Sequence, residues 1–577
     1  MQYQKLAEVY EKASSTTKRL EKTDILSEFL KELKKDESEV LYLLLGDVYA
    51  SYDERKLGMS NQLVIKALTK ATGISKDKII SEWKDIGDIG LVAEKVIKKK
   101  QQATLGHKSL TIKKVIENLR KLPELEGKGT VDKKVSLITE LLISASPLEA
   151  KYLVRAIIGD LRIGVQESTI RDAIAKAYFP NNQKEAGEKI QRAVDNSNDI
   201  AKVFEIAVKK KFSGIEKIDI EVGKPVKVML AQKAESIKDG FKQAGKPAVV
   251  EFKYDGFRMI IHKKDKEVKL FTRNLENVTK QFPEVIDYIK KYVKGKSFII
   301  DSEAVGYDKK TKKYTPFQNI SQRIKRKHKI AELQEKLPVE INVFDVLYYN
   351  GKSLVDKPLK ERRKLLEKII EPQRFKIVKS KEILTDDEKK AAEFYKKALE
   401  MNQEGIMFKN PDAEYKPGRK VGHMLKLKPE ENDLDLVITG AEYGTGKRSG
   451  WLSSFIISCK NKEEFLEVGK VSTGFKEKET QSSKVGEDGG VSFEELTNML
   501  QPYILKEKGK KVEIKPKIIV SVSYQEVQQS PNYNSGIALR FPRFVKLRPD
   551  KHLSEVDTLD EIKAELEKQK KKNYQYG

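Results

Sequence analysis

Residues 251–258, which read EFKYDGFR, place a lysine where it could act as a nucleophile. If VVEFKY forms a strand, Glu251 and Lys253 project from the same face, because side chains alternate along a strand. The dipeptide DG that follows is typical of a turn, and the next strand would return Arg258 toward the same place. A carboxylate, an amine and a guanidinium would then converge. The octapeptide alone fits a charged surface hairpin equally well.

Four later segments place charged or aromatic side chains inside or at the end of apolar runs. Burying a charge is costly unless a partner or a ligand compensates it. Several such residues in one region therefore predict a shared polar cavity. They are Glu303 in SFIIDSEAVGY, Phe344 and Asp345 in EINVFDVLYYNG, Glu404 and Lys409 in EGIMFKN, and Lys426 and Lys428 in HMLKLKPE.

The segment GAEYGTGKRSG only superficially suggests a phosphate-binding loop. Five residues separate Gly440 from Gly446, where that loop has four, and Arg448 stands at the position that requires serine or threonine. A nucleotide would therefore have to be held by side chains carried on strands.

The charge balance favours a polyanionic partner. The chain has 577 residues, with 113 Lys and Arg against 87 Asp and Glu, a formal net charge of +26. Dense mixed charge also occurs on thermostable surfaces, but these do not require so large a basic excess, so nucleic acid is the preferred interpretation.

Other composition features exclude several classes of protein. One cysteine and five scattered histidines argue against disulfides and a Cys/His zinc site. Neither a signal peptide nor an apolar membrane span is recognisable, so we expect a soluble, cytoplasmic protein without a membrane partner.

The elements that would position these residues indicate a multidomain protein of three domains. Apolar residues at helical spacing predict an all-α domain over residues 1–215. Short β-rich runs with helices between them predict an α+β domain over residues 216–429. Further β-rich runs predict a small β-barrel over residues 430–577, followed by a charged C-terminal helix.

The motifs taken in order resemble one enzyme superfamily. K-x-D-G-x-R is followed by D-x-E-A-V, F-D-x-L-Y-x-N-G, E-G-I-M-F-K and L-K-L-K. This series is similar to that of the covalent nucleotidyltransferases, which comprise ATP-dependent DNA ligases, RNA ligases and mRNA capping enzymes. The segments GDLRIGV, AEYGTGKR and RFPRFVKLRPDK extend the resemblance to archaeal ATP-dependent DNA ligases and to the core of the eukaryotic replicative enzyme.

The resemblance implies an ATP-dependent DNA ligase that acts in replication, repair and recombination. Lys253 would attack the α-phosphate of ATP, expel pyrophosphate and form lysine-AMP. The AMP would pass to the 5′-phosphate of a nick, and attack by the 3′-hydroxyl would release it. The three domains would be a helical DNA-binding domain, an adenylation (nucleotidyltransferase) domain and an OB-fold domain. The OB-fold domain would close over ATP for the first step only.

The resemblance also implies a role for each motif residue. The amine of Lys253 must be neutral to attack, and the cations around it would disfavour its protonated form. Mg²⁺ suits the oxygen ligands on offer. The implied roles are base selection for Glu251; base stacking for Phe344; ribose and phosphate contacts for Arg258 and Arg273; ribose and Mg²⁺ contacts for Glu303 and Glu404; α-phosphate contacts for Lys426 and Lys428; and orientation of the leaving pyrophosphate for Arg548, Asp550 and Lys551.

Three places depart from the family pattern. Met424 stands where a tryptophan is common, and the usual arginine pair reads Arg419-Lys420, so either of these two residues could contact the nucleotide. Near residues 101–105, Gln101 or Gln102 with Leu105 fits the start of a sliding-clamp peptide, but its terminal aromatic pair is missing. An exposed loop is the preferred interpretation there.

Two alternatives to a DNA ligase, which we expect to act as a monomer on nicked duplex DNA, can be weighed. An RNA ligase or capping enzyme shares K-x-D-G, but the helical first third and the form EGIMFK argue against both. A DNA-binding scaffold with an inactive core would have no reason to keep Lys253, Glu303, Glu404, Lys426 and Arg548.

Overall fold

The structure is a computed structural model, and its chain forms two compact units, Met1–Lys428 and Pro429–Gly577. It describes residues 1–577 except 35, 100–108, 128, 316, 327, 430–431, 446–447, 449, 478–490 and 576–577. Residues 101–105, for which an exposed loop is preferred over a sliding-clamp peptide, lie outside the described residues. Across the part of the chain that is described, no helix is long and apolar enough to cross a membrane.

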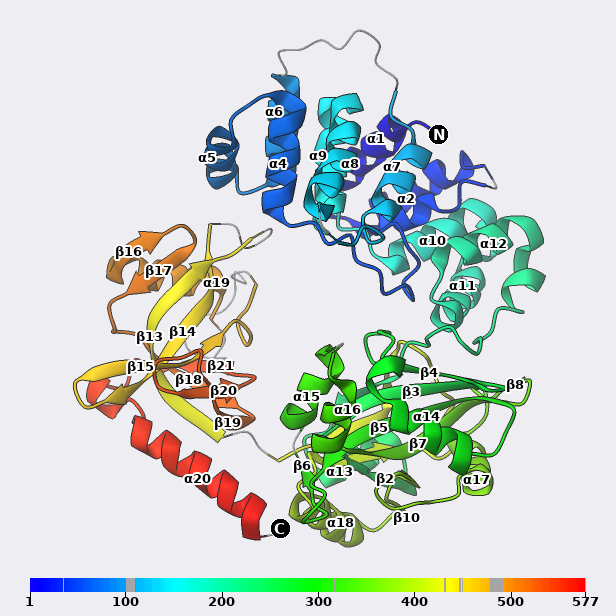
Figure 1. Ribbon diagram of the computed structural model, residues 1–577, viewed down its shortest axis with the longest axis vertical. Coiled ribbons are helices and arrows are strands. Elements are labelled where there is room, and N and C mark those ends of the chain that lie inside the picture. The colour runs from blue at the N-terminus through cyan, green and yellow to red at the C-terminus, as the bar shows by residue number, and fades with distance from the viewer. Residues whose placement is uncertain are drawn as a thin grey trace. The chain divides into compact units, whose positions relative to one another are not determined.

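The first unit begins with a helical region, drawn from blue to teal in Figure 1. Its helices share an apolar core that includes Leu26 and Phe29 of α2 and Tyr152 and Leu153 of α9, at the spacing that the sequence shows. The helices are α1 (Tyr3–Ser14), α2 (Arg19–Lys31), α3 (Val40–Leu44), α4 (Asn61–Thr72), α5 (Lys76–Ile86), α6 (Ile89–Lys98), α7 (Ile112–Lys121), α8 (Thr130–Ser144), α9 (Pro147–Ile157), α10 (Glu167–Tyr178), α11 (Gln183–Ser197) and α12 (Ile200–Ile215).

An α+β region with two sheets completes the first unit. The first sheet has the order β1-β12-β11-β2-β10, and α13 and α18 contact it. The second has the order β4-β3-β5-β7-β8, with β6 beside β5 and β9 beside β7, and α14 and α17 contact it. The strands and helices are β1 (Leu230–Lys233), α13 (Ile237–Ala244), β2 (Ala248–Lys253), β3 (Phe257–Lys264), β4 (Glu267–Thr272), α14 (Pro283–Tyr292), β5 (Ser297–Tyr307), β6 (Tyr314–Thr315), α15 (Phe317–Lys325), α16 (Ile330–Lys336), β7 (Val339–Tyr349), β8 (Lys352–Ser353), α17 (Leu359–Ile369), β9 (Ile377–Lys379), β10 (Glu382–Thr385), α18 (Glu388–Glu400), β11 (Gly405–Lys409) and β12 (Lys420–Leu427).

The segment EFKYDGFR joins these two sheets and is not a hairpin. Strand β2 pairs with β10 and β11, whereas β3 pairs with β4 and β5. The alternative of a surface hairpin is therefore wrong, but Arg258 still lines the same cavity as Glu251 and Lys253. At Gly256 the chain crosses so close to β5 that an added Cβ would lie 2.4 Å from the Ala304 carbonyl oxygen. A side chain there would block the crossing.

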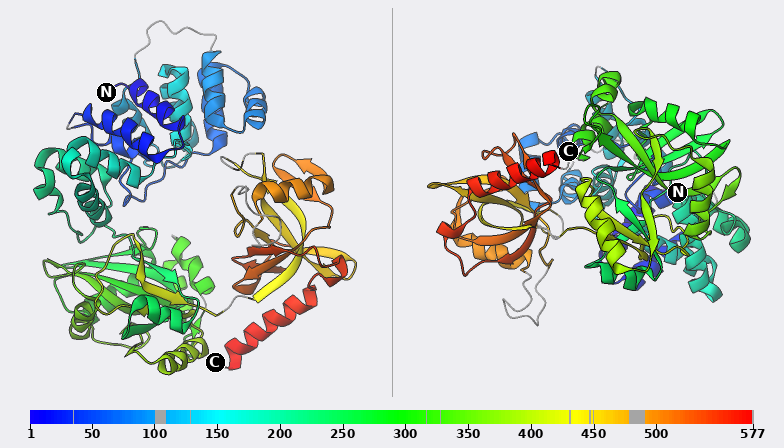
Figure 2. Two further views of the ribbon diagram at one scale, coloured as in Figure 1. Left: turned by 180° about the vertical axis from the view of Figure 1, so that it is seen from behind. Right: turned by 90° about the horizontal axis from the view of Figure 1, so that it is seen from below.

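The second unit is rich in strands and carries a long C-terminal helix, α20, drawn in red in Figures 1 and 2. Its main sheet has the order β15-β14-β13-β17-β16, and β18 pairs with both β13 and β21. Strands β19 and β20 form a separate pair. The elements are β13 (Asn432–Tyr443), β14 (Leu452–Asn461), β15 (Glu464–Val471), α19 (Phe493–Leu500), β16 (Ile504–Lys508), β17 (Lys511–Ile514), β18 (Ile519–Tyr524), β19 (Glu526–Gln529), β20 (Ile537–Arg540), β21 (Arg543–Leu547) and α20 (Leu559–Gln575).

Candidate active site

A cavity of about 1000 Å³ in the α+β region is lined by side chains of both sheets. Because β2 ends in the first sheet and β3 begins in the second, residues on both sides of their junction line this cavity. Most of the residues that the motifs predict are brought together here. Those that line it are Glu251, Lys253, Arg258, Arg273, Glu303, Phe344, Glu404, Lys420 and Lys426.

The amine of Lys253 lies beside an acid. Its Nζ is 2.7 Å from Oε2 of Glu404, and Lys428 pairs with the same oxygen, so Glu404 lies between two ammonium groups. Burial raises the pKa of the Glu404 carboxyl, but the charges of Lys253 and Lys428 outweigh it and hold that pKa well below its usual range. Burial and the charges of Lys253 and Lys428 together lower the pKa of Lys426.

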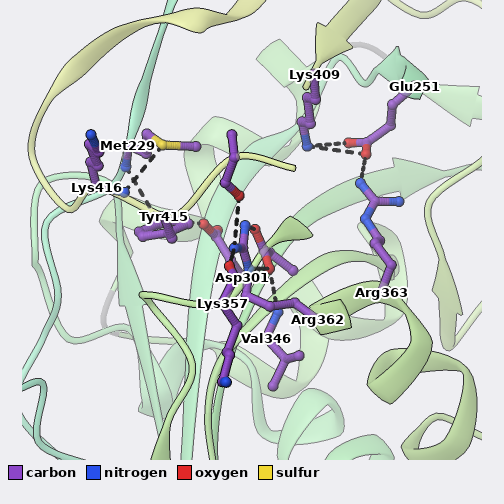
Figure 3. Close-up of polar contacts among 12 residues, drawn as sticks. Met229, Glu251, Asp301, Val346, Lys357, Arg362, Arg363, Lys409, Tyr415 and Lys416 are labelled. Atoms are coloured by element: carbon purple, nitrogen blue, oxygen red, sulfur yellow. Dashed lines mark hydrogen bonds and ion pairs between the residues drawn. The ribbon is translucent and has the colours of Figure 1, made fainter. Parts of the chain in front are cut away.

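The carboxylate of Glu251 is buried, with 2% of the residue exposed. Nζ of Lys409 donates to its Oε1 at 3.0 Å and its Oε2 at 3.1 Å, and Arg363 of α17 donates to Oε2 (Figure 3). Burial raises the pKa of this carboxyl, but the charges of Arg363 and Lys409 outweigh it and lower that pKa. Glu251 is therefore ionised and accepts hydrogen bonds.

Cations flank the ring of Phe344. Nζ of Lys409 lies 4.5 Å from the ring centroid, and Cζ of Arg258 lies 5.3 Å from it. The next residue, Asp345, forms a bidentate ion pair with Arg362, with Nε to Oδ1 at 2.7 Å and Nη2 to Oδ2 at 2.9 Å. This buried pair fixes the strand at the point where the Phe344 ring faces the cavity.

The guanidinium of Arg258 is held by the second sheet. Its Nε donates to Oδ1 of Asp301 at 2.9 Å, its Nη1 donates to the Met229 carbonyl oxygen at 2.8 Å, and its Nη2 pairs with Oδ2 of Asp301. The hydroxyl of Tyr415 donates to the same Oδ2 at 2.9 Å (Figure 3). A guanidinium with this many acceptors has one orientation.

The carboxyl of Glu303 differs from that of Glu404. Among the described residues it has no ion pair, and burial raises its pKa to about 8. Clusters of three or more potential metal ligands are absent from the residues that the structure describes. Mg²⁺, however, is commonly held by one or two carboxylates together with phosphate oxygens and water, so Glu303 and Glu404 fit such an ion.

The remaining predicted residues lie outside the cavity lining. Nε of Arg419 pairs with Oδ2 of Asp195 at 2.7 Å, so that Lys420 is the member of the pair that lines the cavity. In the second unit, Arg548 and Lys551 both pair with Oδ2 of Asp435, at 2.6 and 2.7 Å. Asp550 pairs with Arg548 at 2.8 Å.

Several residues at the site were not predicted to have a role there: Arg362, Arg363, Asp301 and Tyr415. Lys409 was predicted to lie in the shared cavity and lines it, but its pairing with Glu251 was not foreseen. Lys409 ends an apolar strand in EGIMFK, and a charge at such a position predicts an acidic partner. Arg362 and Arg363 fall between Leu359 and Leu366, on the buried side of α17. A charge at such a core-facing helix position signals a buried acid.

Three family models of DNA ligases match successive parts of the chain. The family model described as "ATP dependent DNA ligase domain" matches residues 228–428, "DNA ligase N terminus" matches 2–175, and "ATP dependent DNA ligase C terminal region" matches 448–551. A DNA ligase of Nanoarchaeum equitans (strain Kin4-M) is 46% identical over 572 residues, which cover 99% of each chain. A DNA ligase of Thermococcus fumicolans is 41% identical over 568 residues, covering 97% of this chain and 98% of that one.

A solved structure named Pmar-Lig_PreS3 has a similar fold. It matches with a TM-score of 0.57 and 19% sequence identity, over 94% of this chain and 99% of its own. At this identity the likeness concerns the fold alone.

Proposed function

Because this chain belongs to the ATP-dependent DNA ligase family and seals nicks in duplex DNA with ATP, we propose that Lys253 is the residue that carries the AMP group. The observation that carries the proposal is the position of its amine, in a cavity lined by cations, acids and an aromatic ring. The amine would attack the α-phosphorus and form a phosphorus–nitrogen bond as the bond to pyrophosphate breaks.

The amine can attack only after it has lost its proton. Lys426 and Lys428 repel a third positive charge, whereas Glu404 attracts it. Glu303 and Glu404 would hold Mg²⁺, which supplies positive charge beside the phosphate oxygens and offsets the charge of Glu404. Lys426 and Lys428 would stabilise the charge that develops on the α-phosphate oxygens.

The base would lie against Phe344, with Glu251 at its edge. An ionised carboxylate accepts a hydrogen bond from the amino group of adenine and cannot donate one to the carbonyl of guanine. Lys409 holds both oxygens of Glu251 and lies over the Phe344 ring, so it joins these two groups. Arg258 and Arg273 would contact the ribose and the phosphates. Lys420 is favoured over Arg419 for a nucleotide contact, because Arg419 is paired with Asp195.

The second unit would be an OB-fold, which its strand-rich sheet supports. Arg548, Asp550 and Lys551 would orient the leaving pyrophosphate. Asp435 keeps Arg548 and Lys551 together, because both pair with one of its oxygens.

The helical region would bind duplex DNA through phosphates, without regard to sequence. Action as a monomer inside the cell, and a sliding-clamp contact at residues 101–105, stay predictions.

The proposal is tested by incubating the protein with α-labelled ATP and Mg²⁺ and then adding nicked DNA. We expect covalent label on the wild type that nicked DNA discharges, and none on the Lys253→Ala variant. Lys360→Ala, which changes an exposed lysine of the same region paired with Asp412, is the matched control and should label normally. Label that persists on Lys253→Ala, or that discharges only onto RNA, would contradict the proposal.

A further inference from the structure

Two carboxylates face each other across the edge of the first sheet. Glu251 of β2 and Glu382 of β10 are directly opposite in the antiparallel pair. Like charges in such a position repel and destabilise the sheet. The guanidinium of Arg363 contacts both, through Nη2 to Glu251 and Nη1 to Glu382. Arg363 therefore bridges two acids that would otherwise repel each other.

The hydrogen bonds of Glu251 leave one oxygen with spare capacity. An ionised carboxylate has about four acceptor positions, two on each oxygen. Among the residues that the structure describes, Oε2 accepts from both Lys409 and Arg363, whereas Oε1 accepts from Lys409 alone. Because Glu251 lines the cavity, Oε1 is the atom that can accept a further hydrogen bond from a ligand.

The state of this carboxyl decides which base it can bind. At the same ring position adenine carries an amino group, which donates, and guanine carries a carbonyl oxygen, which accepts. A carboxylate binds the first and repels the second, but a protonated carboxyl can donate to the carbonyl. Base choice therefore depends on Glu251 keeping its charge.

Removing Arg363 would leave the carboxylates of Glu251 and Glu382 to repel each other. Two adjacent carboxylates without a cation between them resist ionising together, so the pair would retain a proton. Lys409 would remain as a partner of Glu251, but Glu382 would lose the contact that Arg363 makes. In part of the molecules Glu251 would then carry a proton, and it would not be a charged acceptor for the base.

We propose that Arg363 is a positioning residue for nucleobase choice, which holds Glu251 as a charged acceptor directed at the amino group of adenine. Arg363 is not part of the cavity lining and acts through Glu251. The proposal rests on the proposed function, since it takes the cavity to be the ATP site.

The test compares covalent labelling of the full chain by α-labelled ATP and by α-labelled GTP, with kcat/KM measured for each. In the wild type we expect ATP to be strongly preferred. Arg363→Met should reduce the ratio of ATP to GTP about tenfold, the effect of losing one hydrogen bond to a charged group. Arg363→Lys should recover part of the ratio, because an ammonium keeps the charge but cannot present the same fork to two acids.

The ratio of kcat/KM for ATP to kcat/KM for GTP is measured within each preparation. Unfolded protein lowers both values equally and leaves their ratio unchanged. Removing the facing acid in the double variant Arg363→Met/Glu382→Gln should restore much of the ratio, because no charge then opposes Glu251. Arg374→Met, at an exposed arginine of the same region, is the matched control and should leave the ratio unchanged.

Two outcomes would overturn the proposal. A wild-type ratio in Arg363→Met, with the wild type itself labelled, refutes the role of Arg363 and leaves the role of Lys253 standing. No label on the wild type from either nucleotide refutes the ATP site, and this inference falls with it.

Discussion

The ion pair of Asp345 and Arg362 is almost fully buried, with 5% and 1% of the two side chains exposed. Replacing Arg362 by methionine would leave the Asp345 carboxylate buried without its partner. We expect a loss of about 3–5 kcal/mol in the free energy of unfolding, measured by urea denaturation. The double variant Asp345→Asn/Arg362→Met should regain part of that loss. Equal stability of the wild type and Arg362→Met would contradict this account.

The same pair gives the wild type a dependence on pH. Burial raises the pKa of Asp345, but the charge of Arg362 outweighs it and lowers that pKa. A carboxyl with a lowered pKa contributes stability above its ordinary value of about 4, and this is lost as the pH falls through the lowered value. In the Arg362→Met variant, the free energy of unfolding measured by urea denaturation should not show this loss as the pH falls.

The crossing between β2 and β3 depends on the lack of a side chain at Gly256. A Cβ there would lie 2.4 Å from the Ala304 carbonyl oxygen and 3.0 Å from Cγ of Glu303. Gly256→Ala should therefore displace Glu303 and β5 relative to Lys253, and a shift of about 1 Å can reduce a reaction rate about a hundredfold. We expect lysine labelling to slow by at least about tenfold, with the protein still folded.

Gly422→Ala on β12 is the control for this change, because its Cβ would meet only Nε2 of Gln232, at 3.7 Å. This variant should label at the wild-type rate. If both glycine variants label alike, the close approach at Gly256 has no bearing on the reaction.

Local patterns predict the elements of this protein much better than their partners. The runs around Lys253, Glu303, Phe344 and Lys426 are strands, because alternation and β-branched residues are local properties. The pairing of β2 with β11 joins segments about 150 residues apart, so the dipeptide DG could suggest a turn but not the sheet to which each side belongs. This is why the hairpin, which the octapeptide alone fits equally well, is not formed.

The residues that line the cavity were largely predictable from the motifs, but those that support them were not. Arg362 and Arg363 are adjacent on one helix and pair with different acids, Asp345 and Glu251. Both arginines lie on the buried side of the helix, and the choice of partner depends on how α17 packs against the sheets. A buried charge can be recognised from a pattern, whereas its partner requires the fold.

The whole chain carries a net charge of +26, and its substrate is a polyanion. In a plot of the logarithm of the DNA-binding constant against the logarithm of the salt concentration, each neutralised phosphate lowers the slope by about 0.9. Roughly six phosphate contacts therefore give a slope near −5. We expect the affinity for nicked DNA to fall about a thousandfold between roughly 50 and 200 mM salt. Labelling of Lys253 by ATP without DNA should change far less over that range. A nick affinity that is insensitive to salt would contradict a phosphate-dominated interface.

The contact between Lys253 and Glu404 has a consequence for the covalent enzyme. If Lys253 carries the AMP group as proposed, its nitrogen is no longer an ammonium, and among the described residues Glu404 then keeps Lys428 alone as its cationic partner. Attachment of AMP to Lys253 would therefore replace a positive charge at this point with a negative charge on the phosphate. The loaded and empty enzymes should separate in native isoelectric focusing, which would report the fraction of molecules ready to seal a nick without any radioactive label.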